Sequence, residues 1–263
     1  MTQNLENDIG FELVDSHCHL DFPEFDENRN ELIQQCKAEN ILKFVVPGVS
    51  KDTWPRLKNI SGQYAEIFPA YGLHPYFLNE HASEHVGQLH TFLKDNSAVA
   101  VGEIGLDYYL KDLDKTLQQC LFAAQLDVAK ELNLPVILHV RKAHDDVLQF
   151  LKHAKLTGGS VHAFNGSFQQ AKQYIDLGYK LGFGGALTFD RAKHLRKLAE
   201  QLPLDAILLE TDSPDMSPAN YSQSFNTPLT ILDVLYQMSQ IRQQTSSEIA
   251  SQTTQNSREL FSL

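Results

Sequence analysis

Residues 11–20 read FELVDSHCHL, and this stretch decides how the rest of the chain is interpreted. An apolar run of the kind found in β-strands ends in two histidines, His17 and His19, that are separated by one residue. Residues i and i+2 of an extended strand point to the same side, so both imidazoles can approach one point. Imidazole nitrogens are common ligands of divalent metals. Taken alone, the pair fits either a chance spacing at a strand end or one corner of a metal site.

The stretch is the first of eight short apolar runs that alternate with longer amphipathic segments. Continuous apolar runs of this length are typical of buried parallel strands. They predict strands over 11–14, 41–46, 67–71, 98–103, 135–139, 160–163, 179–183 and 206–210. Helical spacing of apolar residues predicts helices over 26–39, 116–132, 145–154, 168–177, 192–202, 228–242 and 246–263.

Strand–helix alternation repeated about eight times predicts an α/β protein of the (β/α)₈ TIM-barrel type. The alternative is a doubly wound open sheet, which usually carries a glycine-rich phosphate loop after its first strand. Here the two histidines follow the first strand instead, which favours the barrel. We therefore predict one barrel domain over residues 11–263, preceded by a flexible, polar tail at residues 1–10.

Composition limits the classes of partner and compartment. The net charge of -11 argues against tight binding of nucleic acid by bulk electrostatics, and leaves nucleic acid as a transient substrate. The three cysteines show no CxxC spacing, which fits a reducing compartment. No apolar run is long enough to span a membrane. We expect a cytoplasmic monomer that forms neither a membrane contact nor a stable complex with nucleic acid.

Side chains that bind metals stand at the ends of five predicted strands, where a barrel places its active site. A carboxylate buried among apolar strands is costly unless it is paired or bound to a metal. One or two divalent cations would satisfy the whole set, and the absence of thiolates favours Zn²⁺, Mn²⁺ or Mg²⁺ over a structural cysteine-type site. With two metals one carboxylate must bridge, and Glu103 is predicted to do so. The predicted ligands are His17, His19, Glu103, His139, His162 and Asp212.

Neighbouring residues suggest supporting roles. Asp15 precedes His17 by two residues, so we predict that it is a hydrogen-bond partner of a ligand imidazole. Asp107 is expected to orient a loop or to cap a turn. Tyr108 and Tyr109 could either stack on a nucleic-acid base or pack against the protein.

Together these motifs resemble the TatD family of metal-dependent hydrolases, often described as deoxyribonucleases. The resemblance runs from about residue 11 to the end of the chain. The motifs that carry it, in order, are DSHCHLDF at 15–22, GLHP at 72–75, GEIGLDY at 102–108, PVILHVR at 135–141, HAFNG at 162–166 and LLETDSP at 208–214.

The resemblance implies an amidohydrolase-type barrel with up to two divalent ions. One ion would be bound by His17, His19, Glu103 and Asp212, and the other by Glu103, His139 and His162. The resemblance also implies that His74 and Arg141 lie beside the metals, where a phosphate could reach them. Members of the family typically cleave DNA, and exonuclease action is described for several.

One loop departs from the family pattern. Many relatives carry a basic, glycine-containing loop before the sequence NTP, which here occupies residues 226–228. In this chain residues 219–225 read ANYSQSF and contain no Arg, Lys or Gly. The difference weakens the expectation of contacts with backbone phosphates on that rim and leaves the predicted ligands unaffected.

The leading functional prediction is a deoxyribonuclease, exonuclease-like, that cleaves phosphodiester bonds with a metal-activated water. Asp212 and Glu103 are the predicted catalytic residues, with Asp212 accepting or orienting the proton of the water. His74 and Arg141 are the predicted substrate-binding residues, because a guanidinium forms charge-assisted hydrogen bonds with phosphate oxygens. Tyr108 or Tyr221 could stack on exposed bases. Two alternatives remain: a metal-dependent ester, lactone or amide hydrolase, and a non-catalytic, metal-stabilised scaffold.

Overall fold

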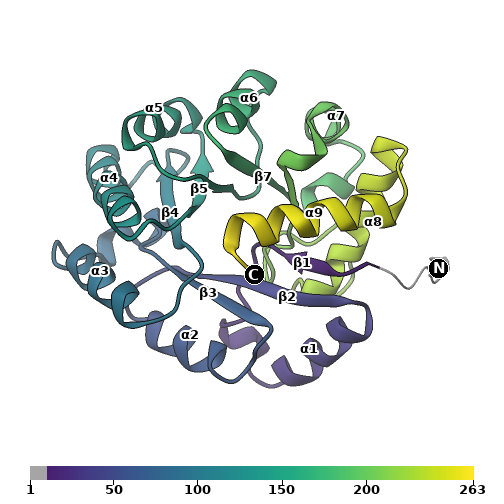
Figure 1. Cartoon of the computed structure of the whole chain (residues 1–263), viewed down its shortest axis with the longest axis horizontal. Helices are drawn as coiled ribbons and strands as arrows, with labels where there is room; N and C mark the ends of the chain where they lie inside the picture. Colours follow the sequence, from purple (N-terminus) through teal and green to yellow (C-terminus); the bar gives the residue numbers. More distant parts are fainter. Residues whose placement is uncertain (1–10) are drawn as a thin grey trace.

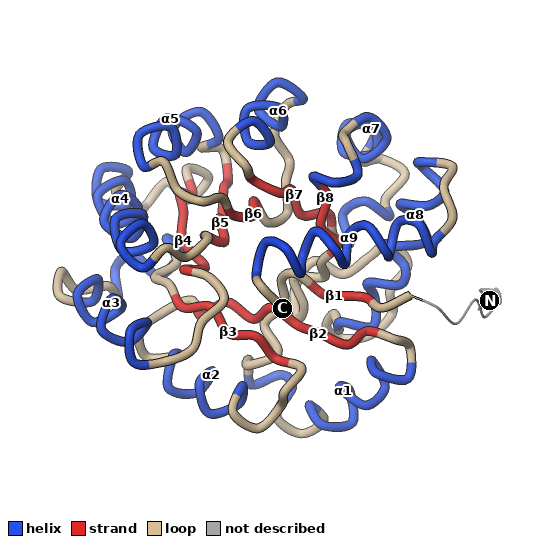
Figure 2. Tube along the Cα trace, viewed as in Figure 1, coloured by secondary structure: helices blue, strands red, loops and turns tan. Residues whose placement is uncertain are grey.

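The structure, a computed structural model, describes residues 11–263 and confirms the predicted (β/α)₈ barrel (Figures 1 and 2). Residues 1–10, for which a flexible tail was predicted, lie outside the described residues. Eight parallel strands follow one another around the barrel in chain order. They are β1 (Leu13–Asp15), β2 (Ile41–Gly48), β3 (Ile67–Tyr71), β4 (Val101–Asp107), β5 (Val136–Arg141), β6 (Gly159–Val161), β7 (Tyr179–Phe183) and β8 (Ile207–Leu209).

The ends of β1 and β8 are joined by hydrogen bonds between the loops that follow them. The backbone N–H of Ser16 donates to the carbonyl of Leu209 at 3.1 Å, and the N–H of Asp212 donates to the carbonyl of His17 at 2.9 Å. The N–H of His19 donates to the carbonyl of Ser213 at 2.7 Å. The barrel therefore closes beside three of the predicted metal ligands, which are His17, His19 and Asp212.

Helices surround the barrel as the outer layer (Figure 2). They are α1 (Arg29–Ala38), α2 (Trp54–Ser61), α3 (His85–Asp95), α4 (Lys115–Leu132), α5 (His144–Ala154), α6 (Phe168–Asp176), α7 (Lys193–Gln201), α8 (Ile231–Arg242) and α9 (Ser246–Phe261). Short 3₁₀ segments occur at Pro23–Phe25, Pro75–Glu80, Gly185–Thr188, Leu204–Ala206 and Pro228–Thr230.

The predicted elements differ from the observed ones in several respects. The strand predicted over 98–103 runs instead from Val101 to Asp107, because its pairing with β5 continues as far as Arg141, so Glu103 lies within the strand and not at its end. The sequence did not predict α2 and α3, because each helix buries only a narrow apolar stripe; α3 buries only Leu89 and Leu93. Strands β6 and β8 also end earlier than predicted, at Val161 and Leu209. The ligand-type residues that follow these two strands therefore lie in loops, where the backbone is free to turn toward the barrel axis.

The last helix closes one end of the barrel. Phe261 of α9 packs against apolar side chains of the strands, among them Val14, Val45 and Ile137. The amide of Asn256 donates to the carbonyls of Leu204 and Ile207, both at 2.8 Å. Figure 1 shows α9 lying across the barrel at this end. The opposite end, where the strands finish, is left open for the site described below.

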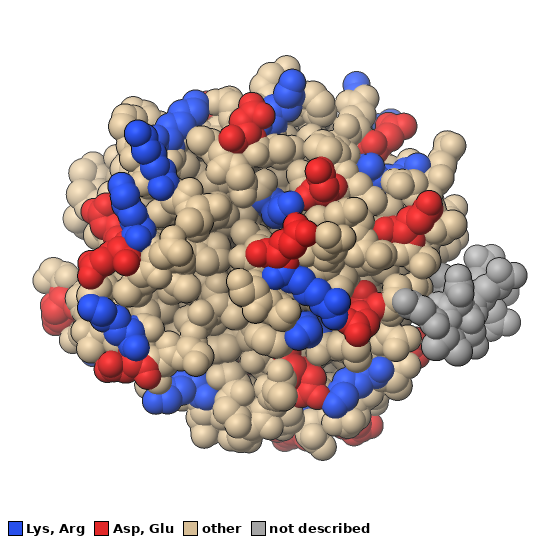
Figure 3. Space-filling model, in the orientation of Figure 1, with Lys and Arg blue, Asp and Glu red and all other residues tan. Residues whose placement is uncertain are grey.

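The face on which α9 lies carries acidic and basic side chains next to one another (Figure 3). Within residues 11–263, each helix is too short or too polar to cross a membrane.

Candidate metal centre

Glu103, at the third position of β4, is the centre of the site. Its side chain is almost completely buried, with 2% of its surface exposed. The other five predicted ligands and His74 converge around it, from β5 and from the loops that follow β1, β3, β6 and β8. The two oxygens of its carboxylate face different groups of side chains.

Oε2 of Glu103 faces the end of β1. It lies 3.4 Å from Nε2 of His17 and 3.9 Å from Nε2 of His19. Oδ1 of Asp212 lies 3.4 Å and 3.6 Å from the same two nitrogens. His17, His19 and Asp212 present ligand atoms that lie within 4.8 Å of one another, which is the spacing expected around one cation.

Oε1 of Glu103 faces three further imidazoles. It lies 3.3 Å from Nε2 of His74, from Nδ1 of His139 and from Nε2 of His162. The structure therefore places Glu103 between two clusters of donors, as a bridging carboxylate requires. His74 lies as close to Glu103 as the predicted ligands His139 and His162 do. By its distance, His74 could therefore bind a metal as well as the substrate.

The donor set fits divalent cations. Nε2 of His17 and Oε1 of Glu103 are buried and make no hydrogen bond with any group of residues 11–263. Buried polar atoms without partners are costly, and a metal held by imidazoles and carboxylates would satisfy both atoms.

The buried imidazoles differ in their protonation equilibria. Burial opposes protonation of His19 and His162, but the carboxylates of Asp212 and Glu103 outweigh it and raise the pKa of His19 to about 9 and that of His162 to about 10, so a cation bound there must displace a proton. Burial lowers the pKa of His17 and lowers that of His74 to about 4, so both rings favour the neutral form that binds metals. Burial opposes ionisation of Glu103, but the surrounding imidazoles, His74 and His162 first, hold its pKa well below the usual value. The carboxylate is therefore ionised and available as a ligand.

Asp107, at the end of β4, supports one ligand ring and a turn. Its Oδ2 lies 3.1 Å from Nε2 of His139, and its Oδ1 accepts from the N–H of Tyr109 at 2.9 Å. Although Asp107 is buried, these hydrogen bonds lower its pKa. The predicted turn-capping role of Asp107 is confirmed, and the carboxylate also fixes the orientation of the His139 imidazole.

The predicted role of Asp15 is wrong. Oδ1 of Asp15 accepts from the backbone N–H groups of Thr211 at 3.1 Å and His17 at 3.3 Å. Oδ2 accepts from the Thr211 hydroxyl at 2.6 Å. The chain bends immediately after β1, so this carboxyl meets backbone rather than an imidazole. Asp15 therefore ties the end of β1 to the end of β8.

Glu210 is a supporting residue to which the sequence analysis gave no role. Its Oε1 accepts from the N–H of Ala163 at 2.6 Å and lies 3.5 Å from Nδ1 of His162. Gly182 leaves room for it, because a Cβ at that position would lie 2.1 Å from Oε2 of Glu210. The available signal was the position of Glu210 as the last residue of the predicted strand 206–210, at the end of the barrel where the active site lies.

The structure separates the roles of the two tyrosines. Tyr108 packs, with its hydroxyl donating to Oδ2 of Asp146 at 2.7 Å. Tyr109 is exposed, and the guanidinium of Arg141 lies over its ring at 3.8 Å from the centroid. Nη1 of Arg141 is 4.0 Å from Oδ2 of Asp107. The exposed guanidinium is thus held beside the metal centre by an ion pair and an aromatic face.

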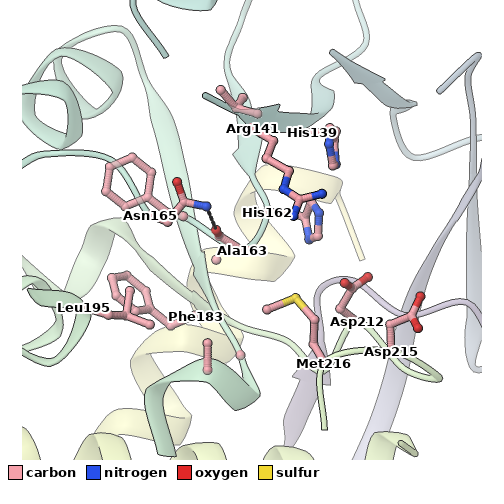
Figure 4. Close-up of a pocket in the computed structure, with 15 residues that line it drawn as sticks. His139, Arg141, His162, Ala163, Asn165, Phe183, Leu195, Asp212, Asp215 and Met216 are labelled. Carbon is pink, nitrogen blue, oxygen red and sulfur yellow. Dashed lines mark hydrogen bonds between the residues drawn. The ribbon is translucent and has the colours of Figure 1, made fainter. Parts of the chain in front are cut away.

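A cavity of about 450 Å³ adjoins the metal centre. His139, Arg141, His162 and Asp212 line it on one side (Figure 4). Tyr221, in the loop that lacks basic residues, lines a separate groove beside α1.

Comparison with known proteins finds relatives over almost the whole chain. The family model described as TatD related DNase matches residues 14–262. The protein named "Uncharacterized metal-dependent hydrolase YjjV" of Escherichia coli K12 is 38% identical over 253 residues, which cover 95% of this chain and 98% of that protein. "Uncharacterized metal-dependent hydrolase YabD" of Bacillus subtilis is 35% identical over 251 residues, with 95% and 98% covered.

Comparison with solved structures also finds a TatD relative and other proteins of similar fold. The crystal structure of Escherichia coli YjjV, described as a TatD homologue, superimposes with a TM-score of 0.92 at 37% identity, covering 95% of this chain and 98% of that one. An organophosphorus hydrolase from Deinococcus radiodurans superimposes with a TM-score of 0.68 at 15% identity over 97% and 93% of the two chains. At that identity the likeness extends to the fold alone.

Proposed function

The chain belongs to the family of TatD-related DNases and is a metal-dependent hydrolase, and from this premise we propose that it is a deoxyribonuclease acting on phosphodiester bonds. The observation that carries the proposal is the position of Glu103 between two clusters of metal-binding side chains, together with the exposed guanidinium of Arg141, which lies 4.0 Å from the carboxylate of Asp107 that contacts His139. Two cations at this centre would activate a water and neutralise charge on the phosphoryl group. Mg²⁺, Mn²⁺ and Zn²⁺ are the candidate ions.

Residues of the chain would complete the reaction. Asp212 has 14% of its side chain exposed, so its carboxylate can reach the attacking water. Burial opposes its ionisation, but His162 and His19 lower the pKa of Asp212 and keep it able to accept a proton. Arg141 would hold the non-bridging oxygens of the phosphate, and His74 would do so wherever it does not bind the metal.

The test is cleavage of end-labelled single-stranded DNA with Mg²⁺, Mn²⁺ or Zn²⁺ and with chelator. We expect metal-dependent cleavage that releases nucleotides from one end. Substituting a residue that hydrogen-bonds to a metal ligand typically lowers metal affinity or activity by about 10- to 100-fold. Glu103→Ala removes the predicted bridging ligand itself, so we expect its cleavage rate to fall by at least about 100-fold. Glu131→Ala, on the exposed face of α4, is the matched control. Cleavage that needs no metal, or equal cleavage by Glu103→Ala, would overturn the proposal.

The second candidate is hydrolysis of a carboxylic ester or lactone. The same centre would activate water for attack on a carbonyl, and the apolar residues that line part of the cavity suit such substrates. A panel of esters and lactones assayed beside DNA separates the two candidates. Turnover of the panel without DNA cleavage would reverse their order.

A further inference from the structure

The cavity beside the metal centre has two chemically different walls. Figure 4 shows His139, His162 and Asp212 on one side and Phe183 and Leu195 on the other. Its volume of about 450 Å³ lies within the range typical of small-molecule sites. The polar wall is accounted for by the metal centre, whereas the apolar wall takes no part in holding a cation.

The apolar wall is accessible to a ligand. Met216 lies in the loop that follows β8 and has 37% of its surface exposed. Leu195, on α7, is only partly buried. Apolar side chains left open beside a reactive centre indicate that part of the substrate covers them.

We propose that this cavity is a subsite for a single, unstacked nucleobase whose phosphate lies at the metal centre. The proposal rests on the phosphodiesterase function argued above. A nucleobase combines flat apolar faces with a polar edge, and the cavity offers the matching surfaces. Leu195 and Met216 would contact the faces, whereas Phe183 lines the same wall but is only 1% exposed. The amide of Asn165, whose Nδ2 makes only a long bond of 3.4 Å to the Ala163 carbonyl, lies at the rim and can reach the edge.

Charge sets which part of a nucleotide occupies the cavity. Asp215 lines it on the same side as Asp212 (Figure 4). Its carboxylate would repel a second phosphate there, so the cavity suits a base and sugar rather than a further length of backbone. A paired and stacked base cannot enter without leaving the helix, which costs energy. The subsite therefore predicts preference for single-stranded ends over intact duplex.

Binding of thymidine 5′-phosphate and of deoxyribose 5-phosphate to the Mn²⁺-loaded protein, measured by titration calorimetry, tests the subsite without relying on turnover. We expect thymidine 5′-phosphate to bind at least about tenfold more tightly, because the base covers apolar surface of Leu195 and Met216 that deoxyribose 5-phosphate leaves exposed to water. Met216→Asn should remove this advantage and leave the affinity for deoxyribose 5-phosphate unchanged. The backbone at Met216 is left-handed, with a φ of 52°, a conformation that asparagine tolerates well.

Two controls accompany the variant. Met216→Leu keeps the apolar surface and should keep the advantage of the base. Leu117→Asn makes the same kind of change at an exposed position of α4 outside the cavity, and should bind both probes as the unchanged protein does.

The possible failures are distinguishable. If deoxyribose 5-phosphate binds but the base adds nothing, or if Met216→Asn retains the full advantage, the subsite is overturned while the phosphodiesterase proposal stands. If neither probe binds and single-stranded DNA is not cleaved, both proposals fall together.

Discussion

A single side chain, Asp107, connects the metal centre to the Arg141 guanidinium that would bind phosphate. Its carboxylate contacts the His139 ring and lies 4.0 Å from the guanidinium of Arg141. The same carboxylate caps the turn that carries Tyr109, on whose ring the guanidinium lies. A change at this residue should therefore affect metal binding as well as substrate binding.

We predict that Asp107→Ala lowers metal affinity by about 10- to 100-fold, because it removes the hydrogen bond that orients the His139 imidazole. Asp107→Asn should lose less, since its single amide oxygen can still accept from the ring or from the N–H of Tyr109, although not from both. Mn²⁺ titration followed by electron paramagnetic resonance measures the affinity. Asp146→Ala removes the partner of Tyr108 and serves as control. Unchanged Mn²⁺ affinity in Asp107→Ala would contradict the assignment.

Asp15 leads to a second prediction at this scale. Burial raises the pKa of its carboxyl to about 8, so the neutral form is favoured and asparagine is a close mimic. Asp15→Ala leaves the Thr211 N–H and hydroxyl without their partner and should cost about 1–3 kcal/mol in the free energy of unfolding. Asp15→Asn should cost less than half of that. Urea unfolding of both variants measures the difference. Equal losses would show that asparagine does not replace the carboxyl, and no loss in Asp15→Ala would show that the hydrogen bonds to Thr211 contribute nothing.

These residues show what sequence spacing can and cannot predict. The two-residue spacing of His17 and His19 predicted that both rings face one point, and the structure places both beside Asp212, although both residues follow the end of β1 and their direction is set by the loop. The same rule failed for Asp15, because β1 ends at that residue and the chain then bends. Periodicity applies only while the strand continues, and the end of a strand depends on hydrogen bonds to distant segments.

Among the elements, α9 is the one that covers the end of the barrel away from the metal centre. The sequence predicted a helix over residues 246–263 but could not show what it covers. The apolar residues of α9 face strand residues from the opposite end of the chain, such as Val14, which no local pattern reveals. By contrast, α2 and α3 were missed because their apolar stripes are narrow.

We predict that Phe261→Ala lowers the free energy of unfolding by about 3–5 kcal/mol, the usual cost of deleting a buried phenylalanine side chain. The ring is 2% exposed and fills the end of the barrel. Urea denaturation is the measurement. Leu117→Ala, at a position that is 58% exposed, should change stability by less than about 0.5 kcal/mol. A similarly small effect of Phe261→Ala would show that the packing of α9 against this end of the barrel contributes little to stability.

At the scale of the whole molecule, the metal centre joins the first and last strands to those between them. A cation bound there should stabilise the folded chain as a whole, because the unfolded chain does not assemble the ligands. A cation present at about 100 times its dissociation constant raises the free energy of unfolding by about 2.7 kcal/mol. In a protein of this size each kcal/mol moves the melting temperature by about 2–4 °C.

We therefore predict that removal of metal by chelation lowers the melting temperature by roughly 5–10 °C, as measured by calorimetry. Re-addition of Mn²⁺ should restore it. In the Glu103→Ala variant, the melting temperatures measured with Mn²⁺ and with chelator should differ much less. A melting temperature that does not change on chelation would mean that the ligands are organised without a cation.

Most of the barrel could be predicted from the sequence because its strands are continuous apolar runs, and most of the ligands because a barrel collects its strand ends at one mouth. The division of the site into two clusters around the two oxygens of Glu103 could not be predicted from spacing. It depends on the three-dimensional positions of residues from six strands, and only the resemblance to a family implied it.

A crystal structure of the Mn²⁺-loaded protein with an anomalous difference map would locate the bound cations directly. We predict two peaks that share Glu103, one beside His17, His19 and Asp212 and the other beside His139 and His162. A single peak that Glu103 does not touch, or no peak among these residues, would contradict this prediction.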